Sequence, residues 1–365
     1  MRLQPITRVA VATLCLCAMT QLVTGQTLLY APEPDKYSID AGETLTTTED
    51  TKIDGYTIRI LDDGVLVNGV GYTMYNNDSG TLTNYIGGTI ENSGTIENSG
   101  TIENLGLVRN NENGIINSNN SISSHIIGNY GTINGSINVR DSGILYNEGT
   151  INGDVNISAV TENPEVYSQN RGVINGNLDL KTGAQMIGGG TINGSVTLGG
   201  RMRPGVYVGS VITGNQTWID GGVYRWQIND SEAIDGSDVM HITEIESGKG
   251  VLDLSNLTTG GFGIEIVSLN DFNQNKNPAN GFDPNTDYEF VILTTIGGIT
   301  GFEAEDFVLN TDDFVNGDGA WAWSVDQDGN NLVLKASAYT LIPEPSSTAL
   351  LALGGLALVA RRKRD

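Results

Sequence analysis

Residues 88–105 read GTIENS, GTIENS and GTIENL, a six-residue unit that occurs three times in succession. Polar and apolar residues alternate within each unit, so Ile90 and Asn92 project from one face of an extended chain, and Thr89 and Glu91 from the other. A glycine every six residues is incompatible with a helix and leaves strands of only three or four residues. Strands this short bury enough apolar surface only when they stack on equivalent strands of the next coil.

The unit recurs in two related forms along the chain. The pattern Gly-x-aliphatic-x-Asn returns at 64–68, 80–84 and 143–147. A second form, with the asparagine one position earlier, is followed each time by a short alternating segment; it begins at Gly131, Gly149, Gly172 and Gly190. These glycines lie 18, 23 and 18 residues apart, a spacing that fits three short strands and three turns per coil. The repeats therefore predict an all-β fold, a parallel β-helix or β-solenoid.

Two features of the repeats refine this prediction. Strict hexapeptides favour a left-handed coil, whereas the variable 18–23-residue spacing favours a right-handed coil, which we expect. Asparagines on the inward face or at the corners should stack and hydrogen-bond as ladders. The candidates are Asn92, Asn98, Asn104 and Asn110. Disorder is the alternative explanation of so much Gly and Asn, but the regular aliphatic positions argue against it.

Proline and aromatic residues mark the limits of the repeats. Between Ala41 and Met202 the one proline is Pro164, which lies in the 23-residue spacing, so we expect Glu162–Tyr167 to loop out of the stack. From about Trp218 the predicted strands lengthen, and Asp328-Gly329 signals a hairpin turn. We therefore expect a solenoid at 26–215 and a C-terminal antiparallel β cap or domain at 216–340, which would close the open end of the stack.

Charge and cysteine content exclude several classes of partner and site. The chain has 19 Lys and Arg against 43 Asp and Glu, a formal net charge of −24. Nucleic acid binding needs clustered basic side chains, and the one basic cluster is 361–364, so we expect no nucleic acid partner. Both cysteines, Cys15 and Cys17, precede the repeats, which leaves the body without a thiol for a disulfide, a zinc site or a nucleophile.

Residues 1–25 have the order of a secretory signal peptide. Two arginines precede Val9–Met19, an apolar run of 11 residues that is too short to cross a bilayer. Gly25 precedes Gln26, so we predict cleavage between these two residues after export through the secretion translocon. The alternative, a retained anchor helix, would need a longer apolar run.

Residues 341–365 contain three elements in a defined order. Pro343-Glu344-Pro345 keeps the chain extended and accessible, Ala349–Ala360 is an apolar run too short for a stable span, and Arg361, Arg362, Lys363 and Arg364 would stay on the cytoplasmic side. This order resembles the PEP-CTERM sorting signal of Gram-negative bacteria. The resemblance implies transient inner-membrane anchoring by a short transmembrane helix, processing by an exosortase, and a cell-surface or extracellular fate. An ordinary tail anchor, the alternative, would have about 20 apolar residues.

The segment from about 200 to 340 resembles the terminal segment of autotransporter-associated β-strand repeat proteins. The resemblance rests on Asp238–Thr243, on the strand Tyr288–Leu293 and on the hairpin Trp323–Leu334. It implies an exported solenoid of the kind found in autotransporter passengers.

Several residues are candidates for catalytic or metal-binding chemistry. Asn285-Thr286-Asp287 and Asn310-Thr311-Asp312-Asp313 match fragments of polysaccharide hydrolase motifs, but we interpret them as acidic turns because no accompanying histidine or arginine motif follows. His125 and His241 are far apart in the chain, so a histidine metal site is not expected. Asp326-x-Asp328-Gly329 lacks the further ligands of a calcium loop, and a hairpin turn is the favoured interpretation.

Two further patterns have structural explanations. Gly188-Gly189-Gly190 precedes a repeat strand rather than a helix, so it is no phosphate loop. Tyr224, Trp226, Trp321 and Trp323 could stack on sugars, but filling of the cap core is favoured. We therefore expect no catalytic, cofactor or metal site.

The sequence predicts a non-enzymatic structural or adhesive protein of the cell surface or extracellular matrix. Repeated polar residues on the solvent faces would suit weak multivalent contact with extracellular polysaccharide. The alternative is a β-helix lyase or hydrolase that acts on polysaccharide, which would require several acids from adjacent coils to converge in one groove.

Overall fold

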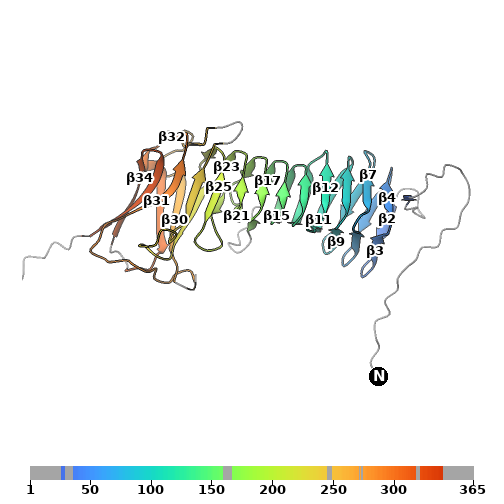
Figure 1. Cartoon of the computed structure of the whole chain (residues 1–365), viewed down its shortest axis with the longest axis horizontal. Helices are drawn as coiled ribbons and strands as arrows, with labels where there is room; N and C mark the ends of the chain where they lie inside the picture. The colour runs from blue at the N-terminus through green and yellow to red at the C-terminus, as the bar shows by residue number, and fades with distance from the viewer. Residues whose placement is uncertain are drawn as a thin grey trace, which may run out of the picture.

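The computed structural model describes residues 26–28, 36–158, 167–244, 249–270, 272, 274–317 and 321–339. These residues form 35 β-strands and one three-residue 3₁₀ helix, η1 (Ala304–Asp306). The strands wind into an elongated stack of coils that runs from β2–β4 at one end to β34 at the other (Figure 1). The expected all-β parallel solenoid is confirmed; its handedness stays a prediction.

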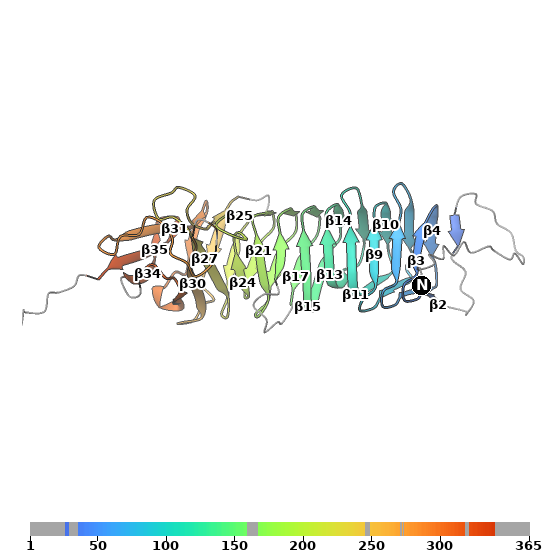
Figure 2. The same cartoon turned by 90° about the horizontal axis from the view of Figure 1, so that it is seen from below.

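Each full coil contributes one strand to each of three faces, here called faces I, II and III. Figure 2 shows consecutive strands of a face lying side by side along the stack. Face I contains β2 (Lys36–Ile39), β5 (Thr57–Ile60), β8 (Thr81–Asn84), the first parts of β11 (Thr101–Asn110), β13 (Ile122–Asn129) and β15 (Ile137–Asn147), then β17 (Val155–Ile157), β20 (Leu178–Leu180), β23 (Val196–Leu198), β26 (Gln216–Trp218), β29 (Val251–Asp253) and β32 (Gly298–Thr300).

Face II contains β3 (Thr44–Thr47), β6 (Val65–Asn68), β9 (Thr89–Asn92), the second parts of β11, β13 and β15, then β18 (Ser168–Asn170), β21 (Gln185–Gly188), β24 (Arg201–Arg203), β27 (Val223–Ile228), β30 (Phe262–Ser268) and β33 (Phe307–Asp313). Face III contains β1 (Gln26–Leu28), β4 (Asp50–Ile53), β7 (Thr73–Asn76), β10 (Thr95–Asn98), β12 (Ile115–Ser118), β14 (Thr132–Asn134), β16 (Thr150–Ile151), β19 (Val173–Ile174), β22 (Thr191–Ile192), β25 (Ser210–Thr213), β28 (Val239–Ile242), β31 (Tyr288–Thr295), β35 (Asn331–Ala338) and β34 (Trp321–Asp328).

Aliphatic side chains from every coil stack along the axis as the core. On face I, Ile58 is in register with Leu82, and Leu82 with Ile102 in the next coil. All three are buried, as the alternation in the repeats predicts. Removing such a side chain from water contributes roughly 1.5–3 kcal/mol. One row of these residues along each face therefore stabilises strands that are too short to be stable alone.

Glycines at the corners allow the turns of successive coils to stack closely. A Cβ at Gly172 would overlap the carbonyl oxygen of Gly149, and a Cβ at Gly149 would overlap that of Gly131. No L-residue with a side chain fits there without displacing backbone. This close approach explains why the second form of the repeat begins with glycine each time.

A second row of inward side chains is polar and forms a ladder along face II. Asn68 donates from Nδ2 to Oδ1 of Asn92 at 2.8 Å, and each later asparagine up to Asn147 donates to the asparagine of the next coil at 2.8–2.9 Å. Thr47 begins the ladder by donating its hydroxyl to Asn68 Oδ1 at 2.9 Å. The asparagines of this buried ladder are Asn68, Asn92, Asn110, Asn129, Asn147 and Asn170. Each also donates to a backbone carbonyl, so the buried amides are satisfied within the stack.

The four asparagines expected to form ladders are all buried and do so, but they belong to three ladders. Asn92 and Asn110 are neighbours on face II, whereas Asn98 lies on face III and Asn104 on face I. Asn98 accepts from Asn76 and donates to Ser118; Asn104 accepts from Asn84 and donates to Ser124. Consecutive six-residue units therefore occupy consecutive faces of one coil, and hydrogen-bond partners come from different coils.

The expected strands of the segment after residue 215 are present, but their pairing is mostly parallel. The coils continue through β32 and β33, and antiparallel pairing occurs at β31–β35 and β34–β35. Gly329, with φ of +57°, lies in the turn that joins β34 to β35, which confirms the predicted hairpin. The antiparallel pair covers the C-terminal end of face III and protects its edge.

Large aromatic side chains fill the wider core at this end. Trp218 stacks on Phe262 with ring centroids 4.3 Å apart, and both are fully buried. Tyr224 and Trp226 are also fully buried, Trp321 is buried, and Trp323 packs against the core. Core filling, rather than sugar stacking, is confirmed for these aromatics.

Some expectations fall on residues that the structure does not describe. These are the signal peptide 1–25, the excursion around Pro164, of which only Tyr167 is described, and the sorting signal 341–365. Among the described residues no helix has both the length and the apolar character needed to span a membrane.

Candidate functional site

The solvent side of face III carries a second asparagine ladder. Asn117 donates to Glu97 at 2.6 Å, and each later asparagine donates to its predecessor at 2.6–2.7 Å. The ladder asparagines are Asn117, Asn134, Asn152, Asn175 and Asn193. The last three are exposed, so this exposed ladder is a surface feature that spans Glu97 and five further coils.

Hydrogen bonding within the exposed ladder leaves capacity for a ligand. A primary amide has two N–H donors and an oxygen with two lone pairs. The ladder uses one donor and one lone pair of each inner asparagine, because each Nδ2 donates once along it and each Oδ1 accepts once. The amides are all oriented the same way, opposite to those of the buried ladder: exposed donors point to the N-terminal coil and buried donors to the C-terminal coil.

A row of smaller side chains accompanies the exposed ladder on the same face, two residues earlier in each coil. Register pairs Thr132 with Thr150, Thr150 with Val173 and Val173 with Thr191. Neighbouring strands are about 4.8 Å apart, so both rows repeat with that period. Amides beside hydroxyls and methyl groups therefore form a regular, weakly amphipathic strip.

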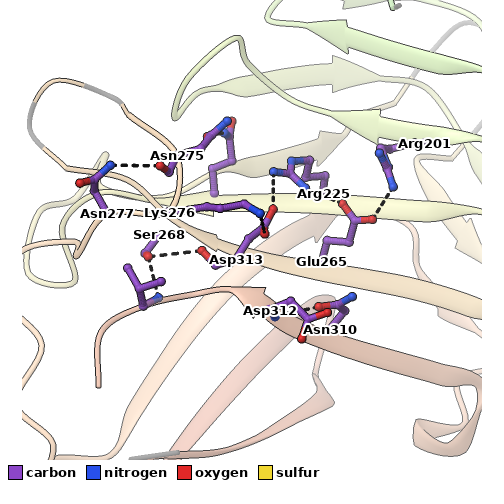
Figure 3. Close-up of polar contacts among 12 residues, drawn as sticks. Arg201, Arg225, Glu265, Ser268, Asn275, Lys276, Asn277, Asn310, Asp312 and Asp313 are labelled. Atoms are coloured by element: carbon purple, nitrogen blue, oxygen red, sulfur yellow. Dashed lines mark hydrogen bonds and ion pairs between the residues drawn. The ribbon is translucent and has the colours of Figure 1, made fainter. Parts of the chain in front are cut away.

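The C-terminal coils carry a charged network on face II (Figure 3). Glu265 in β30 bridges Arg201 in β24 at 2.5 Å and Arg225 in β27 at 2.7 Å. Asp313 in β33 pairs with Arg225 at 2.9 Å and with Lys276 at 2.8 Å. Partial burial by itself would raise the pKa of Asp313, but the hydrogen bonds from Lys276 and Arg225 outweigh it and lower the pKa below its ordinary value. The network links four consecutive coils and pairs three basic side chains with two carboxylates.

Asp238 is a buried carboxyl next to this network. Its Oδ1 accepts from Gly209 N at 2.7 Å and its Oδ2 from Gln227 N at 3.0 Å. Burial raises the pKa of Asp238 well above its ordinary range, although these two hydrogen bonds act in the opposite direction. The carboxyl joins two neighbouring coils, because Gly209 precedes β25 and Asp238 precedes its partner strand β28, and we assign it a structural role.

The acidic side chains of the hydrolase-like and calcium-loop-like segments make local contacts that hold neighbouring segments together. Asp287 accepts from the backbone N–H of Ala338 at 2.7 Å and so holds the end of β35. Asp313 belongs to the charged network, and Asn310 Oδ1 accepts from the N–H of Asp312 at 2.8 Å. Asp326 pairs with Lys335 across the hairpin at 2.7 Å, and the hydrogen bond from Lys335 is the main reason its pKa is lowered.

The histidines lie in separate strands of the stack. His125 is in β13, and His241 in β28 has Nδ1 2.9 Å from Thr294 Oγ1 on the neighbouring strand. Within the described ranges no three His, Cys, Asp or Glu side chains form a group that could hold a metal ion.

Sequence reasoning identified the repeated asparagine of the second form but missed its position. Asn134, Asn152, Asn175 and Asn193 each follow a buried isoleucine directly, so alternation places them on the outside. That signal was available in the sequence. The sequence does not show that Asn117 and Glu97 belong to the exposed ladder, because that depends on which coils are adjacent.

The expected sorting residues Pro343, Glu344, Pro345 and 361–364 lie outside the described residues, as does Gly25; Gln26 begins β1. The described chain ends at Tyr339, directly after β35, and β35 lies at the C-terminal end of the stack (Figure 2). The resemblance of the segment 200–340 to autotransporter-associated repeats stays a prediction.

Comparison with known proteins gives one family match. Residues 341–364 match the PEP-CTERM protein-sorting motif. No curated protein matches the chain. This motif implies export, exosortase-dependent processing, and a fate at the cell surface or outside the cell. The chain is a β-solenoid whose sequence carries a PEP-CTERM sorting motif after its last strand, β35.

Proposed function

We propose that the protein is a non-enzymatic structural and adhesive component of the cell surface or extracellular matrix. In this role the solenoid is a stiff spacer, and the exposed ladder of face III holds it to extracellular polysaccharide. The exposed ladder is the observation that carries the proposal, because its free amide groups form a polar strip without converging catalytic acids.

The arrangement of the chain supports a spacer. Twelve parallel strands lie in order on face III from β1 to β31, which at about 4.8 Å per step makes roughly 50 Å of stacked coils. The sorting motif follows β35 at one end of this stack, and β2–β4 lie at the opposite end. A chain held at its sorting motif would therefore present the N-terminal coils away from the site of attachment.

The exposed ladder supports adhesion through many weak contacts. Each amide offers only a few hydrogen bonds, whose net contribution in water is about 1 kcal/mol each. Five asparagines at a fixed spacing act together, because the first contact raises the effective concentration of the others.

Retention in the matrix tests the adhesive role. The five ladder asparagines would be replaced together by alanine in the native host, which leaves the buried ladder intact. A matched control replaces five outward residues of face I: Thr83, Ser123, Asn156, Thr197 and Thr217. We expect the face III variant to appear in the medium after washing and the face I variant to stay with the matrix. Equal retention of both variants would refute adhesion through face III.

Processing is tested separately by the intact mass of the protein from host cells with and without the exosortase. We expect a C-terminus near Pro343 only in the strain that has the enzyme. An unprocessed chain ending at Asp365 in both strains would refute processing by an exosortase. It would not affect the test of adhesion through face III.

A further inference from the structure

Near the N-terminal end of the stack, the turns at the corner between faces II and III alternate in length. The turn from β6 to β7 is 69–72 and that from β11 to β12 is 111–114, four residues each, while the turn between them, Ser93-Gly94, has two residues. A short turn between two long ones leaves a notch. The notch is an open cavity of about 540 Å³.

The wall of the notch combines one aromatic ring with several hydrogen-bonding groups. Tyr130, 42% exposed, lies in the next turn along the corner, and Val70, 73% exposed, stands on the opposite side. The polar lining includes Arg109, Glu112 and Asn113. Ligand sites are concave and combine apolar surface with convergent polar groups, and the notch contains both kinds of side chain.

Contacts within the notch hold Asn111 and Arg109 in place. Asn111 Nδ2 donates to Ser93 Oγ at 2.8 Å, across one coil. Arg109 pairs with Glu91 at 3.3 Å through one of its nitrogens, which leaves its other N–H groups for a ligand. A Cβ at Gly128 would lie 3.6 Å from Tyr130 Cε2, so the tyrosine ring lies beside strand β13, where no side chain intervenes.

We propose that this notch is a binding site for a neutral saccharide, one or two sugar units of a longer glycan. A pyranose ring presents an apolar C–H face, which packs against Tyr130, and a rim of hydroxyls, which pairs with Arg109, Glu112 and Asn113. The chain has a net charge of −24, and Glu112 adds a carboxylate at the site, so an anionic sugar is disfavoured.

The proposed saccharide site is discrete and lies on a different part of the surface from the exposed ladder. It deepens the adhesive role proposed above and rests on it only for the kind of ligand. The notch is one saccharide site near the N-terminal end of the stack, whereas the ladder is a long strip.

Saturation-transfer NMR and calorimetry on the mature, full-length secreted protein test the site. The probes are cellotetraose, maltotetraose and chitotetraose, with tetragalacturonate as the anionic comparison. At least one neutral tetraose is expected to bind, and Tyr130→Ala and Asn113→Ala should each weaken it by about five- to tenfold. Tyr85→Ala is the matched control, because Tyr85 is 37% exposed in the turn between β8 and β9. It should change binding by less than about twofold.

Three results would overturn the proposal. They are no binding of any neutral tetraose, equal losses in Tyr130→Ala and Tyr85→Ala, and equal affinity for tetragalacturonate. If the notch bound no saccharide but retention in the matrix still depended on the face III asparagines, the adhesive role would stand without the notch. If the face III and face I variants were retained equally while the notch still bound a neutral tetraose, adhesion through face III would be refuted and the saccharide site would stand.

Discussion

Asn147 donates its side-chain amide to Asn170 at 2.8 Å, although 23 residues separate them. Asn129 donates to Asn147 at the same distance over 18 residues. The extra residues between Asn147 and Asn170 therefore leave the stack undisturbed. Strand register, rather than chain length per coil, determines which side chains meet.

Replacing an asparagine of the buried ladder should lower the free energy of unfolding far more than replacing one of the exposed ladder. Asn129→Ala removes a residue that accepts from Asn110 and donates to both Asn147 and the carbonyl of Thr150. It leaves buried polar atoms unpaired, so we expect a loss of about 2–4 kcal/mol in the free energy of unfolding. Asn152→Ala, in the exposed ladder, should cost less than about 1 kcal/mol. Denaturant titration measures both, and similar losses would contradict a special role for burial.

The start of the face I ladder offers a test of ladder capping. Asn84 Oδ1 is buried and has no hydrogen-bond partner among the described residues, whereas Thr47 caps Asn68 on face II. Ile60 has the register position relative to Asn84 that Thr47 has relative to Asn68. Ile60→Thr should therefore cost less than about 1 kcal/mol, because its hydroxyl pairs with that oxygen.

Ile58→Thr is the control for this substitution, since Ile58 is equally buried but faces Leu82 in the next coil. Its hydroxyl would lack a partner there, and we expect a loss of about 2–3 kcal/mol. Thermal unfolding of the two variants side by side makes the comparison. Equal destabilisation would show that the oxygen of Asn84 does not accept the new hydroxyl.

Stacked turns should not tolerate a methyl group. In Gly172→Ala the new Cβ overlaps the carbonyl oxygen of Gly149, so the coils must separate locally. We expect a loss of about 2–4 kcal/mol, comparable with overpacking of a core. Gly189→Ala is the control, because its Cβ would lie 3.6 Å from the nearest atom, which is ordinary contact. A Gly172→Ala protein as stable as Gly189→Ala would mean that the turns are not closely stacked in solution.

The charged network should make stability depend on acidic pH. The lowered pKa of Asp313 means that its charged form stabilises the folded state above the ordinary carboxyl pKa of about 3.9, and that this contribution is lost as pH falls through the lowered value. Asp313→Asn should therefore be less stable than the parent protein by about 1–2 kcal/mol at pH 7. Denaturant unfolding from pH 7 to pH 2.5 should show this difference shrink towards zero. A constant difference would mean that Asp313 acts through packing alone.

The class of fold could be predicted from short-range pattern alone. Alternation of Thr, Ile, Glu and Asn in 89–92 determines which side chains point inward, because that period of two is a property of any extended strand. Glycine at 88, 94 and 100 determines where the strands end. The hairpin at Asp328-Gly329 follows from local turn chemistry in the same way.

Contacts between coils required the tertiary structure. Asn98 and Asn104 were expected in ladders, but their partners, Ser118 and Ser124, depend on the lengths of the intervening turns. The notch beside Tyr130 arises because turns in neighbouring coils differ in length. It could not be predicted from one segment of sequence, because the turns that form it lie in different coils.

The sequence by itself thus determined the inward and outward sides of each strand, the turns and the sorting motif, because these depend on residues close together in the chain. The tertiary structure decided which asparagines form the exposed ladder with Glu97, how far parallel stacking extends beyond residue 215, and where the corner opens into a notch. These features depend on register between strands about 20 residues apart, and register is set by the packing of whole coils on one another.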